Sequence, residues 1–175
     1  MMEDDDGDAN AIPIQHIKHF LETLAKAAMD LLGNLPKGLK GSMIETQVLQ
    51  NLYPIRVWRD LIHCNFVVPQ SLSDGDGRWR AGAIATLIEI IGACAVYTSV
   101  GNLSVSVEFN VSYFSTGKIQ EEVEIEAKVL LGHKGNLSSV VVVIKKKQNG
   151  DLVAIGKQWK SAFDINLKSH WCSTL

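Results

Sequence analysis

The chain lacks an excess of charge of either sign. Its 175 residues carry 17 Lys and Arg against 19 Asp and Glu, which gives a net charge of −2. Proteins that bind nucleic acids generally present a basic surface, because release of counterions from the phosphates supplies much of their affinity. The balanced charge therefore predicts no nucleic-acid partner, while the 46% of hydrophobic residues suffices for the core of one domain.

Cysteine is also scarce, and its spacing excludes two common kinds of site. The three cysteines, Cys64, Cys94 and Cys172, lie far apart, and no Cys-x-x-Cys motif occurs. This spacing predicts neither a zinc site nor a disulfide framework, and the five scattered histidines add no metal-binding set. We therefore expect reduced thiols, no metal, and no cofactor other than one carried by a substrate.

No targeting signal stands out in the sequence. The first ten residues are acidic, whereas a secretory signal needs a basic start and an apolar stretch. The last residues, SHWCSTL, resemble a peroxisomal serine-x-leucine signal only faintly, because the central basic residue is absent. The expected location is the cytoplasm, with the peroxisome as the alternative.

Hydrophobic periodicity divides the chain into four parts. Residues 1–10 form an acidic tail that has no core-forming side chains. Residues 11–45 hold a helix and a linker, since apolar side chains recur there every three or four residues up to about residue 32. Residues 46–165 form the main domain, with a first strand expected at 46–53 and an extended stretch at 55–68. Residues 166–175 form a C-terminal tail.

The most apolar segment runs from about Ala81 to Thr98 and contains one charged side chain, Glu89. Its length suits a membrane span, but a carboxylate at the bilayer centre costs roughly 3 kcal/mol. A helix that is apolar all round is equally typical of the core of a globular domain. We therefore predict a buried central helix and no membrane span, in which the apolar surroundings disfavour the charged form of Glu89.

After this helix the hydrophobic period changes to two, the period of a strand. In residues 103–114 apolar side chains alternate with a set expected to face solvent: Ser104, Ser106, Glu108, Asn110 and Ser112. Similar strands follow at 121–131, 137–147 and 152–163. Short connections make neighbouring strands antiparallel, and the apolar face of the sheet must be covered. The predicted fold is α+β: an antiparallel sheet wrapped around the long central helix, with an extra N-terminal helix.

Two stretches carry a family likeness, DGDGRWRAGAIATLIE at 74–89 and VSVEFNVSYFSTGKI at 105–119. They resemble the hotdog-fold acyl-CoA thioesterases, in particular the phenylacetate-pathway type and the thioesterase superfamily members. That family carries an asparagine, a glycine three residues on, and a His-Gly-Gly that opens the central helix. The resemblance covers about two-thirds of the chain, from about Leu49 to Trp159. It implies the hotdog fold and hydrolysis of a fatty or aryl acyl-CoA thioester to free acid and coenzyme A.

The resemblance also assigns the start of the helix. The family histidine, which helps to orient the thioester, falls at Arg80, and the first glycine falls at Ala81. The second glycine is kept as Gly82. The backbone N–H groups of Ala81 and Gly82 are thereby implied to stabilise the oxyanion, because the first amides of a helix lack internal partners and lie at its positive end.

Three further positions complete the implied site. The family acid falls at Glu89, which is the expected general base or nucleophile. The family asparagine falls at Asp74, and the serine of the following strand is kept as Ser106. Asp74 is expected to position water or the carboxylate, and Ser106 to hold the lytic water.

Helix geometry predicts how these groups assemble. Glu89 lies eight residues after Ala81, hence about 12 Å further along the same helix. A glutamate side chain cannot span that distance, so one thioester meets both groups only if they come from two subunits. We therefore predict a homodimer or a dimer of dimers with the site at the interface, which the resemblance also implies.

Two other functions remain open at this point. Asp74, Arg80 and Ala81 depart from the family motif, which favours a catalytically weak or inactive hotdog protein that binds an acyl ligand or acts as an assembly partner. A hotdog dehydratase ranks last, because it needs a histidine where Arg80 stands. Glu89 also has a purely structural interpretation, as a core acid tied to a hydroxyl, a backbone group or an arginine.

Overall fold

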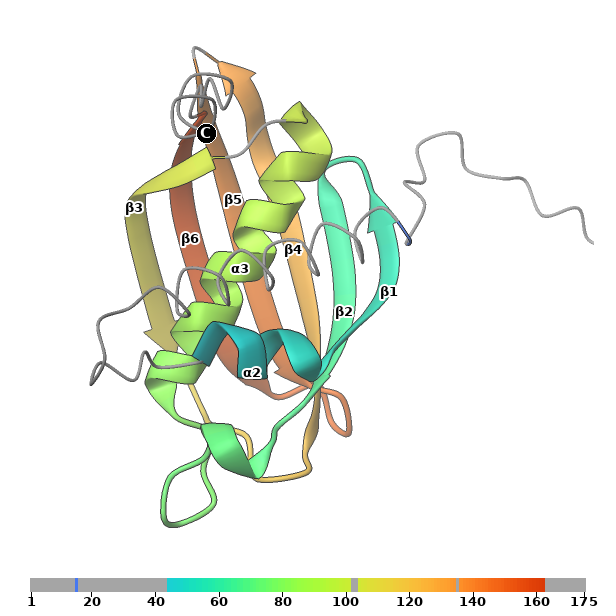
Figure 1. Cartoon of the computed structure of the whole chain (residues 1–175), viewed down its shortest axis with the longest axis vertical. Coiled ribbons are helices and arrows are strands. Elements are labelled where there is room, and N and C mark those ends of the chain that lie inside the picture. The colour runs from blue at the N-terminus through green and yellow to red at the C-terminus, as the bar shows by residue number, and fades with distance from the viewer. Residues whose placement is uncertain (1–14, 16–43, 102–103, 135, 163–175) are drawn as a thin grey trace, which may run out of the picture.

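The computed structural model describes residues 44–162 apart from 102, 103 and 135, together with Gln15 in isolation. A sheet of six strands lies against one long helix, α3, which crosses its face (Figure 1). The elements in chain order are α2 (Ile44–Gln50), β1 (Leu52–Trp58), β2 (Leu61–Val67), the 3-10 turn η1 (Gln70–Leu72), α3 (Ala81–Val100), β3 (Ser104–Tyr113), β4 (Glu122–Lys134), β5 (Leu137–Lys146) and β6 (Leu152–Ala162).

The sheet is antiparallel throughout, in the order β1-β2-β4-β5-β6-β3. Strand β3 follows α3 directly in the chain but pairs only with β6, so it forms one edge while β1 forms the other (Figure 1). The predicted long central helix and the four strands after it are therefore confirmed. The sheet shields one side of the helix, as the apolar face of both elements requires.

The core lies between α3 and the inner face of the sheet. Val123, Ile125 and Ala127 of β4 are buried at alternate positions, as the period-two pattern predicted. From the helix, the buried set includes Ile84, Leu87, Ile88, Ile91, Cys94, Ala95 and Val96. By length and composition α3 could also cross a membrane, but half of its most apolar window is buried inside the protein, as in the core helix of a globular domain.

Helix α3 approaches β6 closely, because glycine stands at the contact. A Cβ built on Gly156 of β6 would clash with the Cγ2 of Ile88. One built on Gly92 of α3 would come within 2.6 Å of the side-chain amide of Gln158. That amide donates a hydrogen bond of 2.8 Å to the carbonyl of Ile88. These contacts hold β6 close to the middle of the helix.

The beginning of the domain differs from the prediction. The prediction of a strand at 46–53 is wrong. Residues 44–50 form the helix α2, in which Val48 belongs to the core, and β1 begins only at Leu52. The extended stretch expected at 55–68 is interrupted by a hairpin turn, at which Asp60 adopts a left-handed conformation with φ of 70°. An Arg-Asp pair is not a typical hairpin signal, so the sequence did not reveal this turn. The helix expected within 11–45 lies outside the described residues except for Gln15, which is helical.

Candidate active site

The start of α3 presents backbone donors. Arg80 precedes the helix in an extended conformation and provides no side-chain cap. Its carbonyl accepts the first helical bond, from Ile84 at 3.1 Å. No group among the described residues accepts a hydrogen bond from the N–H of Ala81 or Gly82, and both residues are exposed. The positive end of the helix is therefore open at the position that the sequence analysis assigned to the oxyanion.

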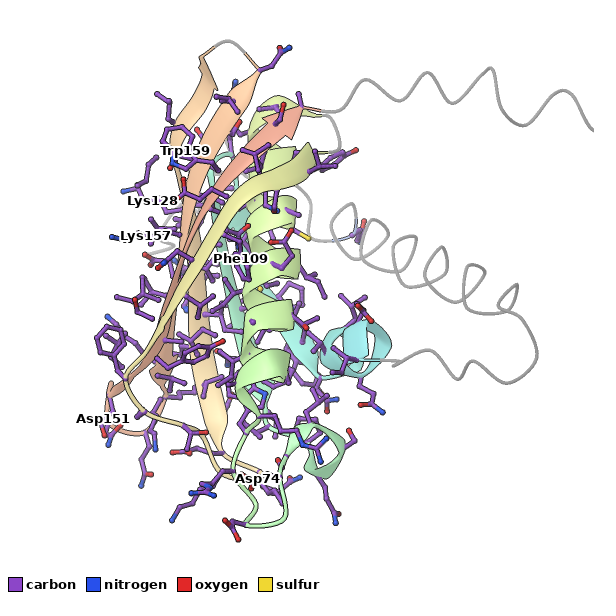
Figure 2. All side chains as sticks on the ribbon, turned by 90° about the vertical axis from the view of Figure 1, so that its left-hand side faces the viewer. Asp74, Phe109, Lys128, Asp151, Lys157 and Trp159 are labelled. Atoms are coloured by element: carbon purple, nitrogen blue, oxygen red, sulfur yellow. The ribbon has the colours of Figure 1, made fainter. Side chains whose placement is uncertain are left out.

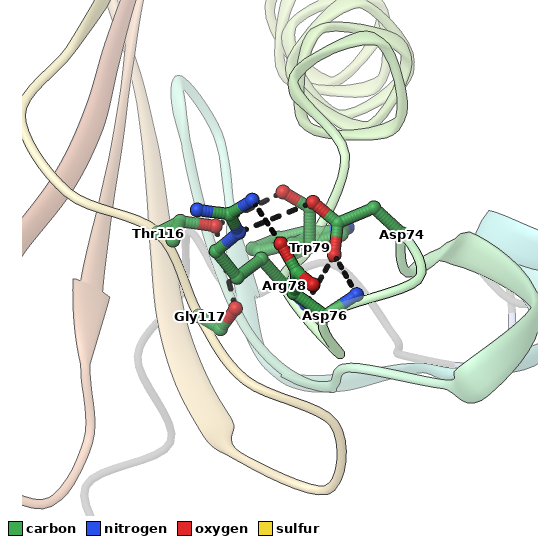
Figure 3. Close-up of polar contacts among 6 residues, drawn as sticks. All are labelled: Asp74, Asp76, Arg78, Trp79, Thr116 and Gly117. Atoms are coloured by element: carbon green, nitrogen blue, oxygen red, sulfur yellow. Dashed lines mark hydrogen bonds and ion pairs between the residues drawn. The ribbon is translucent and has the colours of Figure 1, made fainter.

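Neighbouring loops hold this helix start in place. Trp79 is buried and stacks on Phe66 with ring centroids 5.0 Å apart. Its backbone N–H donates to the carbonyl of Gly117 at 2.9 Å, and its backbone carbonyl accepts from the hydroxyl of Thr116 at 2.9 Å (Figure 3). The hydroxyl of Tyr113, at the end of β3, donates to the carbonyl of Ala81 at 3.0 Å, and partial burial raises the pKa of Tyr113.

Asp74 closes the loop before the helix. Its Oδ1 accepts the N–H of Asp76 at 3.0 Å and that of Arg78 at 2.9 Å, and its Oδ2 accepts from Arg78 Nε at 3.2 Å (Figure 3). These bonds, above all the one from the Arg78 backbone, lower the pKa of Asp74. The carboxylate thus stabilises a turn within its own loop, and its predicted role in positioning water remains a prediction.

Glu89 lies in a triangle of polar side chains from three elements. Its Oε1 accepts a hydrogen bond of 2.6 Å from the hydroxyl of Ser106 on β3 and one of 2.8 Å from Lys160 Nζ on β6. The third side, from Lys160 Nζ to Ser106 Oγ, measures 2.7 Å. The side chain of Lys160 is 0% exposed, whereas that of Glu89 is 39% exposed. The acid is therefore ion-paired and partly open to solvent, unlike the desolvated setting expected from the sequence, and it is tied to a hydroxyl, as the structural interpretation of Glu89 expected.

A β-bulge brings Ser106 into this triangle. Ser106 pairs with Lys160, but the next register pair is Glu108 with Trp159, so Val107 is an extra residue. Ser106, just before the bulge, faces the helix. After the bulge, Phe109 faces the helix and Glu108 lies with Trp159 on the outer face of the sheet. The predicted alternation is therefore wrong for the side of the strand on which Ser106 lies, although Ser106 is exposed as expected. The bulge has no glycine to mark it, so the sequence pattern looked regular.

Lys160 was missed by the sequence reasoning, although a signal was present. Strand β6 carries Lys157 and Lys160 at positions of opposite parity, so one of the two has to face the covered side of the sheet. Figure 2 shows Lys157 and Trp159 on the side of the sheet away from α3, with Phe109 towards the helix. Lys160 takes the inner side together with Gln158, and both are buried.

The two halves of the expected site remain separate within one chain. Ala81 and Glu89 belong to the same regular helix, about 12 Å apart along its axis. Arg80 is exposed and makes no ion pair with Glu89 or any other acid among the described residues. No cluster of three or more potential metal ligands occurs among those residues either.

Comparison with known proteins identifies the family. The family model of the thioesterase superfamily matches residues 77–154. Acyl-coenzyme A thioesterase 13 of Mus musculus is 30% identical over 115 residues, which cover 65% of this chain and 81% of that protein. The chain belongs to the thioesterase superfamily.

Solved structures of other thioesterases share the fold. Zebrafish thioesterase superfamily member 2 superposes with a TM-score of 0.71 at 24% identity, and the match covers 87% of this chain and all of that one. A thioesterase protein of Streptococcus pneumoniae solved with coenzyme A gives a TM-score of 0.63 at 16% identity, over 67% and 90% of the two chains. The hotdog fold expected from the resemblance is thereby confirmed for this thioesterase.

Within this thioesterase, the family match includes the helix start, Glu89 and Ser106 but ends before Lys160. Asp74 lies just ahead of it. The structure therefore adds to the recognised region one buried lysine that holds two of the expected site residues together.

Proposed function

We propose that this protein is an acyl-CoA thioester hydrolase, which converts a fatty or aryl acyl-CoA to the free acid and coenzyme A. One observation carries the proposal: the helix that presents the open amides of Ala81 and Gly82 also carries Glu89, held in place by Ser106 and Lys160. The names of the related proteins support the same class of substrate.

The chemistry needs a donor for the oxyanion and a base or nucleophile. In the first route Glu89 removes a proton from water as the oxygen adds to the thioester carbonyl. The negative charge that develops on the carbonyl oxygen is stabilised by the N–H groups of Ala81 and Gly82. The tetrahedral intermediate then expels the coenzyme A thiolate, which takes up the proton held by Glu89.

The second route differs in its first bond. The carboxylate of Glu89 adds to the carbonyl carbon itself, and departure of the thiolate leaves a mixed anhydride. Water then cleaves the anhydride to the product acid and protonated Glu89, and transfer of that proton to the thiolate restores the carboxylate and yields coenzyme A. Label found in Glu89 after a single turnover in ¹⁸O-labelled water would establish this route, because it enters the side chain when water attacks the glutamyl carbonyl of the anhydride.

The site is proposed to form between two subunits. The helical distance between Ala81 and Glu89 supports this arrangement, because the amides of one copy must approach the acid of another. Strand β3 supports it as well, since it is an edge strand that exposes Val105, Val107 and Phe109. Exposed apolar edges favour pairing with a further strand. A homodimer joined along β3, or a dimer of such dimers, satisfies both features.

A non-catalytic acyl-binding protein is the second candidate. It is favoured by one specific feature. Asp74 stands in place of the family asparagine, and both of its oxygens accept hydrogen bonds from its own loop. The cytoplasmic location, the peroxisomal alternative and the absence of any cofactor beyond coenzyme A remain predictions from the sequence.

Hydrolysis of a panel of acyl-CoAs separates the two candidates. Release of coenzyme A is followed with a thiol reagent, from acetyl-CoA through palmitoyl-CoA and including phenylacetyl-CoA. We expect turnover that falls about 10²–10⁴-fold in Glu89→Gln, the range for loss of a general base. An inactive wild type that still binds the acyl-CoAs by calorimetry would establish the binding protein instead.

A further inference from the structure

Lys160 is an unusual side chain for the interior of this domain. It is one of four buried polar or charged residues in the described part of the chain, and its side chain is 0% exposed. Burying an ammonium is unfavourable unless its protons are accepted by well-placed partners. Two partners are in reach, Glu89 Oε1 and Ser106 Oγ, so the lysine is directed at the proposed site.

The directions of the hydrogen bonds follow from the chemistry of the three groups. An ammonium donates and never accepts, so Ser106 Oγ accepts from Lys160. The one hydroxyl proton of Ser106 then points to Glu89 Oε1. Oε1 receives two hydrogen bonds in this arrangement, while Oε2 is buried and receives none from the described residues. The triangle therefore distinguishes the two oxygens of the acid, because Lys160 and Ser106 both hold the carboxylate through Oε1.

We propose that Lys160 is a positioning residue for hydrolysis: it pairs with Glu89 Oε1 and thereby orients both the carboxylate and the Ser106 hydroxyl. This inference rests on the proposed function, because it assigns Glu89 the reactive role. It adds a residue that lies outside the region matched by the family model.

A purely structural role explains the lysine less well. Strand β6 is already fixed to α3 by Gly156 against Ile88 and by the hydrogen bond from Gln158 to the Ile88 carbonyl. Replacement of a buried ion pair by apolar groups of similar size is often neutral or stabilising in proteins. A charge at position 160 is thus unnecessary for docking the strand, whereas a nearby cation is what an ionised catalytic acid requires.

The other groups around Glu89 do not supply that cation. From β3 the neighbour is the neutral hydroxyl of Ser106, and from β6 it is Lys160. Further along α3, Cys94 is buried, and desolvation raises the pKa of its thiol to about 12, so it is neutral near pH 7. Among the described residues, Lys160 is the charged group that pairs with Glu89.

The test compares pH–rate profiles of the full-length wild type and two neutral variants, Lys160→Met and Lys160→Gln. We expect kcat on an accepted acyl-CoA to fall about 10–100-fold with a smaller change in KM, because orientation of the acid is lost. Removal of the cation also favours protonation of Glu89, so the acidic limb of the profile should move to higher pH. Lys160→Arg keeps the charge, so the acidic limb of its pH–rate profile should lie closer to that of the wild type than the limbs of the neutral variants do.

Lys157→Met is the matched control, because it removes a lysine from the outer face of the same strand. It should leave both kcat and the pH profile unchanged. A purely structural role for Lys160 predicts a different outcome, namely lower thermal stability with an acidic limb at the wild-type pH. That result in both neutral variants would overturn the proposal.

A second readout separates this proposal from the proposed function. The titration of Glu89 is followed by NMR with ¹³C-labelled glutamate carboxyl groups, assigned with Glu89→Gln. An upward shift of its midpoint in both neutral variants supports the pairing role even if the wild type hydrolyses no acyl-CoA, in which case the proposed function alone fails. An unchanged midpoint overturns the role of Lys160 whatever the activity.

Discussion

Glu89 and Lys160, 71 residues apart in the sequence, meet at 2.8 Å between α3 and β6. The lysine is fully buried and the glutamate is partly open to solvent. The helix contributes the acid, the inner strand contributes the cation, and the edge strand contributes the Ser106 hydroxyl that joins them. The acid is thus oriented by two side chains that come from two different strands.

The first prediction concerns stability. Glu89→Gln leaves the buried ammonium of Lys160 without its counter-charge, and we expect a loss of about 1–2 kcal/mol in the free energy of unfolding. This is below the value for fully buried pairs, because Glu89 is partly exposed. The double variant Glu89→Gln, Lys160→Met should recover most of that loss. Urea unfolding of the four proteins measures the coupling, and simple additivity of the two changes would contradict it.

The second prediction separates activity from stability at Gly82. A Cβ at this position meets no atom of the chain within 4 Å. Gly82→Ala should therefore fold at least as stably as the wild type, with a gain of up to about 1 kcal/mol from helix propensity. If the adjacent amides bind the thioester oxygen, the added methyl should still raise KM or lower kcat. Unchanged kinetics in a stable variant would place the substrate elsewhere.

The third prediction concerns the contact between helix and sheet. Gly156→Ala forces a methyl group against the branched side chain of Ile88, which is fully buried in the core. We expect a loss of about 1–3 kcal/mol, the usual cost of overpacking a core. The substitution Ile88→Ala removes the clashing Cγ2, so it should be less harmful in the Gly156→Ala background than in the wild type. Thermal unfolding of the two single variants and the double variant provides the measurement.

The fourth prediction addresses assembly. Val107 lies in the bulge of the edge strand β3, and 58% of it is exposed. If two copies join along β3, Val107→Lys should shift light-scattering masses from dimer to monomer and reduce hydrolysis in parallel. Ile55→Lys at the opposite edge, on β1, should leave both properties unchanged. A wild type that is monomeric at the concentration of an activity assay would contradict the shared site.

The fifth prediction concerns the thiols. Cys64 and Cys94 are buried, and desolvation is the main cause of the raised pKa of both groups. Because the thiolate is the reactive form, neither should react with a thiol reagent in the native protein near pH 8. A Cys172→Ser variant makes the assay report on these two alone. Both should become reactive when the protein is unfolded in guanidinium, and rapid native labelling would contradict their burial.

Local sequence patterns determined the architecture of this protein. The apolar run from Ala81 and the period-two segments after it predicted the helix and four strands, because helix and strand periods are set by the backbone geometry of single elements. The family motif likewise located Glu89 and the open helix start. The Arg-Asp hairpin and α2 were not predicted, since neither has a strong local signal.

Tertiary structure decided what surrounds the acid. The bulge at Val107 turned Ser106 inwards, and the register of β6 chose Lys160, rather than Lys157, for the covered face. Both choices depend on how strands pair and on how closely glycine lets β6 approach α3, which are contacts between residues remote in the chain. The sequence therefore contained the carboxylate, but only the packing of helix on sheet supplied its cation.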